Sequence, residues 1–201
     1  MQCACKECLA PPPPDSKAIS ADVRTLDFAG LGSFDVVVMD PPWQLAGQQP
    51  TRGVALSYSQ MSDREILALP IEGLSKNGLL FLWTINIKLP MALQMLRKWG
   101  YTYAQEVIWV KRTVNRRLAK CHGYYLQHAK ETCLVGIKGK GDEWRMGIAS
   151  DVIYTERREQ SKKPKELYDM IEQLVPNGAY LEIFGRRHNL RNKWTTIGNE
   201  I

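Results

Sequence analysis

A run of β-branched residues that stops abruptly at two prolines constrains the fold of this chain more than any other feature. Residues 34–39 include three successive valines and a methionine, and Asp40-Pro41-Pro42-Trp43 follows at once. Such an apolar run predicts a strand that is buried on both faces. Because proline cannot donate to the sheet, the strand ends at Asp40. A carboxylate and an indole therefore follow the carboxyl end of a buried strand, which is where open α/β sheets bind ligands.

At 201 residues, the chain is long enough for one domain with a sizeable core. Its alternation of strand-like and helix-like segments predicts a mostly parallel α/β sheet with helices on both faces. We expect a flexible, proline-stiffened leader at residues 1–20 and a single domain at residues 21–201. No apolar run reaches the roughly 20 residues of a membrane span, and no segment resembles a signal peptide. We therefore expect a location in the nucleus or cytosol.

The positions of the elements follow from apolar periodicity and from local start and stop signals. Besides the first run, strands are expected at residues 78–84, 103–110, 131–137, 179–184 and 194–197. Helices are expected at residues 89–99 and 164–174, each with an apolar face. A capping box at residues 62–65 predicts a further short helix, which Pro70 stops.

Basic residues gather in clusters along the chain. The net charge is +6 and the pI is about 9.1, which favours a polyanionic partner. The clusters comprise Lys111, Arg112, Arg116, Arg117 and Lys120; Arg157, Arg158, Lys162, Lys163 and Lys165; and Arg186, Arg187, Arg191 and Lys193. One such cluster would be an ordinary solvated face, whereas several of them near candidate motifs favour a nucleic-acid backbone. Two long connections, at residues 44–61 and 111–129, have the length of binding loops or lids.

The Asp-Pro-Pro-Trp motif has two interpretations. Asp-Pro pairs commonly just end a strand, in which case the tryptophan belongs to the core. A large ring directly after a tight turn instead favours the rim of a site, and we expect Trp43 there. Asp40 and the main-chain carbonyl of Pro41, stiffened by Pro42, can then accept both hydrogens of a nucleobase amino group while Trp43 stacks on the base. Such fixed acceptors direct the amine lone pair at an electrophile without a covalent intermediate or a metal.

The cysteines give little support for a metal site. Cys3, Cys5 and Cys8 crowd the N-terminus, but a fourth ligand is missing, and closed zinc sites normally have four. We therefore expect no metal and free thiols. Cys133 lies in an apolar run and is expected in the core.

Asp40-Pro41-Pro42-Trp43 after a hydrophobic strand resembles the catalytic motif of S-adenosylmethionine-dependent N6-adenine methyltransferases. Further segments are similar to the eukaryotic MT-A70 family and occur in the family's order: residues 21–27, 58–63, 80–83, 106–111, 128–136, 161–164, 182–186, 188–189 and 194–199. The resemblance implies a permuted, Rossmann-like methyltransferase fold, in which the catalytic strand precedes the main cofactor strand. It also implies S-adenosyl-L-methionine as cofactor, S-adenosylhomocysteine as product and a nuclear enzyme.

The resemblance implies cofactor contacts by position: Asp22, Val23, Asp40, Lys163, Glu182, Arg186, His188, Asn189, Asn199 and Glu200. Lys163 matches a lysine that pairs with the methionine carboxylate, and Asp22 and Val23 match the segment that reads the cofactor's adenine. Many relatives have glutamine in place of Glu200, and Arg187 stands where the family pattern has proline. Taken singly, Lys163 would be only a base that flanks a helix.

For the substrate, the candidate contacts are Trp43, Tyr58, Lys111, Arg112, Arg116, Arg117 and Glu131. The resemblance implies a heterodimer in which a degenerate partner subunit has lost the catalytic motif, with residues 111–129 as the candidate interface, and further DNA-binding subunits are also implied. It is closest to the catalytic subunit of the ciliate DNA adenine methyltransferase complex, which favours DNA. An mRNA N6-adenosine methyltransferase catalytic subunit is the alternative, and a non-catalytic nucleic-acid-binding scaffold is the second alternative.

Overall fold

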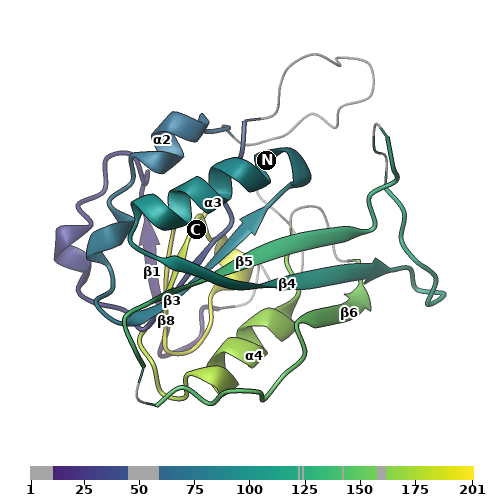
Figure 1. The fold of residues 1–201 in the computed structure, drawn as a ribbon. Helices are drawn as coiled ribbons and strands as arrows, with labels where there is room; N and C mark the ends of the chain where they lie inside the picture. The colour runs from purple at the N-terminus through teal and green to yellow at the C-terminus, as the bar shows by residue number, and fades with distance from the viewer. Residues whose placement is uncertain (1–10, 45–58, 122, 124, 142, 158–161) are drawn as a thin grey trace.

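The computed structural model describes residues 11–44, 59–121, 123, 125–141, 143–157 and 162–201. Within these ranges the chain forms an eight-stranded sheet in the order β1-β8-β7-β2-β3-β5-β4-β6 (Figure 1). The strands are β1 (Lys17–Ser20), β2 (Val36–Met39), β3 (Gly78–Thr84), β4 (Thr102–Arg112), β5 (Lys130–Lys138), β6 (Val152–Glu156), β7 (Tyr180–Ile183) and β8 (Trp194–Gly198). The helices are α2 (Asp63–Leu67), α3 (Leu89–Lys98) and α4 (Lys165–Leu174), with 3-10 turns η1 (Ala29–Leu31), η2 (Ile71–Gly73), η3 (Asn86–Lys88) and η4 (Arg187–Asn189).

The sheet has a parallel half and a mainly antiparallel half. From β1 through β8, β7 and β2 to β3, every neighbouring pair of strands is parallel. The long strand β5 then runs antiparallel to both β3 and β4, and β6 pairs with β4 in parallel at the edge. The predicted mostly parallel α/β sheet is confirmed. β2, which carries Asp40 at its end, lies beside β7 from near the end of the chain, as a permuted order requires.

Helices cover both faces of the sheet, and the side chains of β2 alternate between the two layers. α3 and α4 lie on opposite faces of the sheet (Figure 1). Val37 packs in the layer that contains Met95 of α3, and Val36 packs in the layer that contains Leu167 of α4. Each of these side chains is fully buried, and burial of one large apolar side chain contributes about 1.5–3 kcal/mol. Both faces of β2 are therefore closed, and only its end is open to a ligand.

Local signals fix the helices where the sequence predicts them. The Ser62 hydroxyl accepts a hydrogen bond from the Glu65 backbone N–H at 3.2 Å, and the Glu65 carboxylate accepts one from the Ser62 N–H at 2.7 Å. This reciprocal pair is the predicted capping box at the start of α2. α3 has Pro90 in its first turn and is followed by Gly100, whose φ of 79° few other residues adopt.

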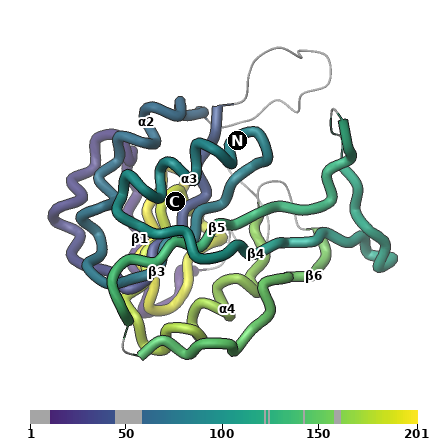
Figure 2. The backbone as a smooth tube through the Cα atoms, viewed as in Figure 1, coloured from purple at the N-terminus to yellow at the C-terminus, as the bar shows by residue number. Residues whose placement is uncertain are grey.

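Several strands differ from the sequence-based expectations at their bounds. β1 lies within the segment expected to be a leader, where it pairs with β8 through main-chain hydrogen bonds, so the sheet begins before residue 21. β6 was not expected, because a short edge strand that is buried on one side carries little apolar pattern. β4 and β5 extend beyond the end of β3, and the segment that joins them projects from the sheet, as the tube in Figure 2 shows.

The cysteines that the structure describes are free thiols. Cys133 is buried in the core, as predicted, and Cys121 is partly exposed. Cys3, Cys5 and Cys8 lie outside the described residues. In the described ranges, no three His, Cys, Asp or Glu side chains come together as ligands for a metal ion. The helices found there are too short or too polar to cross a membrane.

Candidate active site

A pocket of about 270 Å³ lies at the edge of the sheet where the parallel strands end. Each strand of the parallel half contributes residues at or beyond its carboxyl end. These residues are 21–24 after β1, 40–43 after β2, Ile85 after β3, 184–186 after β7 and 198–200 at the end of β8. The carboxyl ends of parallel strands are the usual place for a ligand in such sheets. The remaining lining residues are Ser59, Met61, Glu131, Lys163, Glu182 and Asn189.

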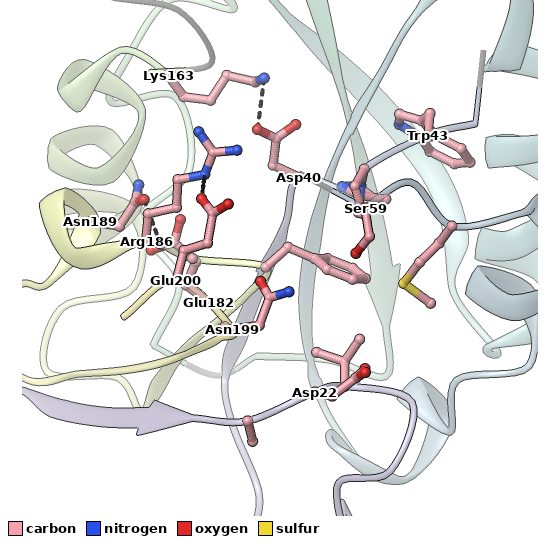
Figure 3. Close-up of a pocket in the computed structure, with 18 of the residues that line it drawn as sticks. Asp22, Asp40, Trp43, Ser59, Lys163, Glu182, Arg186, Asn189, Asn199 and Glu200 are labelled. Atoms are coloured by element: carbon pink, nitrogen blue, oxygen red, sulfur yellow. Dashed lines mark hydrogen bonds and ion pairs between the residues drawn. The ribbon is translucent and has the colours of Figure 1, made fainter. Parts of the chain in front are cut away.

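One end of the pocket holds a chain of opposite charges. The Lys163 ammonium lies 2.8 Å from the Asp40 carboxylate (Figure 3). It also lies 3.2 Å from the Glu131 carboxylate, and Lys111 pairs with the other oxygen of Glu131. Burial raises the pKa of Asp40, and Lys163 opposes that shift without cancelling it. Burial also acts on Glu131, but Lys163 and Lys111 outweigh it and hold the pKa of Glu131 below its usual value. Burial would lower the pKa of Lys163, but its two carboxylate partners outweigh burial and raise this pKa above its usual value.

The segments after β1, β7 and β8 bring two further ion pairs and the Asn199 amide to the pocket. Arg186 Nε lies 2.9 Å from a Glu200 carboxylate oxygen, across a parallel bridge between the segments after β7 and β8 (Figure 3). Asp22 pairs with Arg24 at 2.6 Å, and this hydrogen bond lowers the pKa of Asp22. Asn199 lies between these two pairs and lines the pocket. Charged side chains therefore line both sides of the pocket, and those near Asn199 are paired with one another.

The floor of the pocket contains a buried carboxyl, Glu182 of β7, which is only 3% exposed. The Tyr168 hydroxyl donates to its Oε1 at 2.6 Å, and the Asn189 amide in turn donates to the Tyr168 oxygen at 3.0 Å. Burial raises the pKa of Glu182 to about 8, although the Tyr168 hydrogen bond opposes the shift. Glu182 is therefore mostly neutral at pH 7. Its Oε2 has no hydrogen-bond partner among the described residues.

The backbone between β7 and the pocket is strained. Phe184 has a φ of 70°, a left-handed conformation that costs a non-glycine residue about 1–2 kcal/mol. The next residue, Gly185, approaches β8 so closely that a Cβ on Gly198 would lie 1.9 Å from the Gly185 carbonyl oxygen. This close approach holds the two segments together at the pocket, and strain of this kind persists where the surrounding structure imposes it.

The structure overturns the expectation that Trp43 stands at a rim. Trp43 is 7% exposed and belongs to the apolar core, and its indole N–H donates to the Trp83 carbonyl at 3.1 Å. The main chain of Trp43 forms a parallel bridge with Met61. The Trp43 side chain lies on the far side of Asp40 from Lys163 (Figure 3). The prediction for Trp43 was wrong because burial of its ring depends on contacts with Met61 and Trp83. The local sequence of the turn does not indicate these contacts. Only a small part of Trp43 reaches the pocket, so stacking of this ring on a base has no support here.

The other expected catalytic and cofactor positions can be located directly. The pocket is lined by Asp22, Val23, Asp40, Pro41, Pro42, Lys163, Glu182, Arg186, Asn189, Asn199 and Glu200. His188 of η4 is not among the lining residues, so a cofactor contact from its side chain has no support in this structure. The Pro41 carbonyl already accepts a hydrogen bond from the Trp43 N–H at 2.8 Å, which leaves it one further lone pair.

The expected substrate residues divide into separate groups. Glu131 and Lys111 pair with each other, and Glu131 lines the pocket. Arg112 is half-buried, with its guanidinium 3.9 Å from Glu156 and above the Tyr154 ring. Arg116 and Arg117 are exposed in the turn beyond β4. Tyr58 lies outside the described residues.

The sequence reasoning missed several lining residues: Ala21, Arg24, Ser59, Met61, Ile85, Phe184, Gly185 and Gly198. Ile85 directly follows β3, and Phe184 and Gly185 directly follow β7. The rule that ligands bind beyond the carboxyl ends of parallel strands would have found these three. Met61 gives no such signal, because its place depends on the bridge to Trp43.

The arrangement suits a ligand that has both charged and neutral parts. Lys163, Arg186 and Asn189 supply donors for an anionic group, and Asp40 and Glu131 supply acceptors for a cationic or amino group. The Asn199 amide can both donate and accept hydrogen bonds, which suits an uncharged polar group. A cavity of about 270 Å³ lies near the lower end of the range for small-molecule sites, which begins at about 300 Å³.

Comparison with known proteins gives a consistent family relationship. The family model MT-A70 matches residues 34–200. The chain is 40% identical over 185 residues to a human protein named N(6)-adenosine-methyltransferase catalytic subunit METTL3, an alignment that covers 91% of this chain and 31% of that protein. It is 38% identical over 189 residues to an Arabidopsis thaliana protein named N(6)-adenosine-methyltransferase MT-A70-like, covering 93% of this chain and 26% of that protein.

A further relative carries a different printed role. The chain is 30% identical over 194 residues to a Xenopus laevis protein named N(6)-adenosine-methyltransferase non-catalytic subunit METTL14, covering 90% of this chain and 42% of that protein. In each of these comparisons the chain spans less than half of the relative's length. Identity is higher to the relative named as catalytic than to the one named as non-catalytic.

Proposed function

The chain belongs to the MT-A70 family, and from that membership we propose that it is the catalytic domain of an S-adenosylmethionine-dependent methyltransferase acting on N6 of adenosine in RNA. One observation carries the proposal. Asp40 stands at the open end of a fully buried strand, inside a pocket that also contains Lys163, Arg186 and Asn189. A structural Asp-Pro turn has no need of such a pocket.

The pocket residues fit the cofactor's chemical groups. S-adenosylmethionine has a carboxylate, an ammonium and a sulfonium at one end and an uncharged adenosine at the other, and it supplies a methyl group that is activated by the positive sulfur. Lys163 and Asn189 are suited to hold the carboxylate, and the charged end of the pocket provides acidic groups for the cationic centres. Asp22, Asn199 and Glu200 supply polar groups that are suited to hold the adenosine end, and Val23 supplies an apolar contact.

Asp40 would prepare the adenine amine for methyl transfer. The lone pair of this amine is delocalised into the ring, which makes it a poor nucleophile. The Asp40 carboxylate and the free lone pair of the Pro41 carbonyl can accept the two amine hydrogens and localise that lone pair. The amine nitrogen gives up a proton after it has gained the methyl group. Because burial raises the pKa of Asp40, this carboxylate accepts a proton more readily than an exposed one.

RNA is proposed over DNA because of the relatives' names. The human, Arabidopsis and Xenopus relatives are all named for adenosine, the ribonucleoside. The preference for DNA that the sequence resemblance suggests has no support in these names, and the likeness to a ciliate DNA complex stays a prediction. Most of the long connection at residues 44–61, a candidate binding loop, lies outside the described residues. Charge does not separate the two polymers, because both present phosphates.

We further propose that the chain acts with a second, methyltransferase-like subunit in the nucleus. The Xenopus relative is named as a non-catalytic subunit, and its similarity over 90% of this chain indicates that such a subunit shares the fold. The connection between β4 and β5 projects from the sheet (Figure 2). It carries exposed apolar side chains, including Val114, Leu118 and Leu126. These belong to residues 111–129, the segment that the sequence offers as the interface.

The test is transfer of a labelled methyl group from S-adenosylmethionine to matched RNA and DNA oligomers of the same sequence. The chain is assayed alone and with a purified METTL14-type subunit, and nucleoside analysis of the product identifies N6-methyladenosine. We expect transfer to RNA to exceed transfer to DNA. Transfer to DNA only would restore the DNA interpretation. Binding of nucleic acid without S-adenosylhomocysteine binding in calorimetry would support the non-catalytic scaffold instead.

A further inference from the structure

Lys111 is a member of the most basic segment of the chain, yet its charge is not presented to the surface. Its side chain is 15% exposed, and its ammonium pairs with Glu131 on the neighbouring strand β5. Glu131 in turn accepts from Lys163 at 3.2 Å, and Lys163 lies 2.8 Å from Asp40. Four side chains from β4, β5, the segment before α4 and the end of β2 therefore form one unbroken chain of alternating charge.

Two indole rings contact the two lysines of this chain. The Lys111 ammonium lies 4.8 Å from the centroid of the Trp109 ring, and the Lys163 ammonium lies 5.2 Å from that of Trp83. The two rings meet edge to face, with centroids 6.5 Å apart. Trp109 is held in turn by a hydrogen bond from its indole N–H to Thr155 at 3.0 Å. Cation–π contacts of this kind limit the positions that each lysine can take, which suits a positioning role.

We infer that Lys111 is a positioning residue that sets the place of Lys163 in the pocket through Glu131. Without Lys111, the Glu131 carboxylate has Lys163 as its remaining partner and holds it more strongly. Lys163 is then less available to a ligand carboxylate in the pocket. This inference rests on the proposed function for the identity of the ligand, but the contacts among the four side chains do not depend on it.

The alternative role for Lys111 is direct contact with nucleic-acid phosphates. The two roles have opposite signatures. Loss of a phosphate contact lowers the salt dependence of nucleic-acid binding by about one unit of slope and leaves cofactor binding unchanged. Loss of a positioning residue weakens cofactor binding and leaves the salt slope unchanged. One substitution, followed by both measurements, therefore separates them.

The test is Lys111→Met in the full chain, with Lys120→Met as the matched control. Lys120 is an exposed lysine of the same segment, so the control removes the same charge from a side chain outside the ion-pair chain. Calorimetry with S-adenosylhomocysteine is expected to show binding weakened about fivefold to thirtyfold in Lys111→Met and unchanged in Lys120→Met. Lys111→Arg keeps the charge and is expected to bind within about twofold of the unaltered chain. Equal affinity of Lys111→Met and the unaltered chain would overturn the inference.

A double-mutant cycle shows whether the effect passes through Glu131. In a Glu131→Gln background, the further change Lys111→Met is expected to have no additional effect on S-adenosylhomocysteine affinity. If Lys111 acted on the ligand by direct attraction, the same loss would remain in that background. A persistent loss would therefore contradict the proposed route.

Thermal unfolding provides a measurement that does not require a ligand. The shifts in Tm for Lys111→Met and Lys163→Met are expected to be non-additive when Glu131 is present and additive in Glu131→Gln. Additive shifts in both backgrounds would refute the linkage between the two lysines. If the unaltered chain binds no S-adenosylhomocysteine, the proposed function fails, and this unfolding cycle still decides whether Lys111 and Lys163 are coupled.

Discussion

The parallel and antiparallel halves of the sheet place their functional side chains in different ways. In the parallel half, β2, β3 and β7 are buried along their whole length, so most residues that reach the pocket come from the segments beyond the strand ends. In the antiparallel half, Lys111 and Glu131 lie within β4 and β5, which are only partly buried. A strand that is closed on both faces reaches a ligand mainly through the residues beyond its end. A partly open strand can also contribute side chains from within the strand near its end, as Lys111 and Glu131 do.

In the parallel half, the end of β2 is expected to be the reactive position. We expect Asp40→Ala to reduce methyl transfer by about 100- to 1000-fold, because it removes a preorganised acceptor from the reacting amine. The assay is label transfer at saturating cofactor, with Asp40→Asn to separate the loss of charge from the loss of an oxygen acceptor. Lys130→Ala, from the antiparallel half, serves as the control. Activity of Asp40→Ala near that of the unaltered chain would reject the role given to Asp40.

A second prediction concerns the pH dependence of stability, which the buried carboxyl in β7 should dominate. The folded-state pKa of Glu182 is about 8, against a usual value of 4.5. Between these values the folded state binds more protons than the unfolded state, so Glu182 lowers stability progressively as pH rises from about 4.5 to about 8. Glu182→Gln copies the neutral carboxyl and should remove this loss, which is of the order of a few kcal/mol.

Chemical denaturation at several pH values measures the free energy of unfolding of the unaltered chain and of Glu182→Gln. Glu172 provides a control of opposite sign, because its pairing with Arg191 and Trp194 holds its pKa below the usual value despite burial. The contribution of Glu172 to the free energy of unfolding is present above the pKa of this group in the unfolded state and is lost as the pH falls. The proposal for Glu182 fails if Glu182→Gln and the unaltered chain lose stability in parallel between pH 5 and pH 8.

A smaller effect is expected from the core tryptophan of the parallel half. Trp43→Phe removes the hydrogen bond to the Trp83 carbonyl and leaves that buried acceptor unpaired. We expect a loss of about 1–3 kcal/mol in the free energy of unfolding. If Trp43 stood at a rim, the same change would leave stability within about 0.5 kcal/mol, as surface substitutions usually do. Urea denaturation, with unchanged m-value, distinguishes the two positions.

The smallest effect is expected in the antiparallel half, at the exposed turn after β4. Arg116→Ala combined with Arg117→Ala should lower the slope of log affinity against log salt by about 1 to 2 for single-stranded RNA. Cofactor affinity should stay unchanged, in contrast to Lys111→Met. Fluorescence anisotropy at several salt concentrations gives the slope. An identical slope for the double variant and the unaltered chain would show that these arginines do not contact phosphates.

Much of the fold could be predicted because its signals are local. The run at residues 78–84 matches β3 at both bounds, and the capping box at Ser62 marks the start of α2. The bounds of β4 and β5 were expected too short by one to two residues, since the antiparallel pairing extends beyond the apolar core. β1 gave no local signal, because it is held by pairing with β8.

The sequence by itself determined that a carboxylate ends a buried strand at Asp40, because β-branched residues and prolines act on their own neighbours in the chain. Only the tertiary structure decided that Trp43 is buried and that Lys111 is drawn into an ion-pair chain with Glu131, Lys163 and Asp40. These contacts join residues that are far apart in sequence. Their existence depends on the order of the strands, which no local pattern of residues specifies.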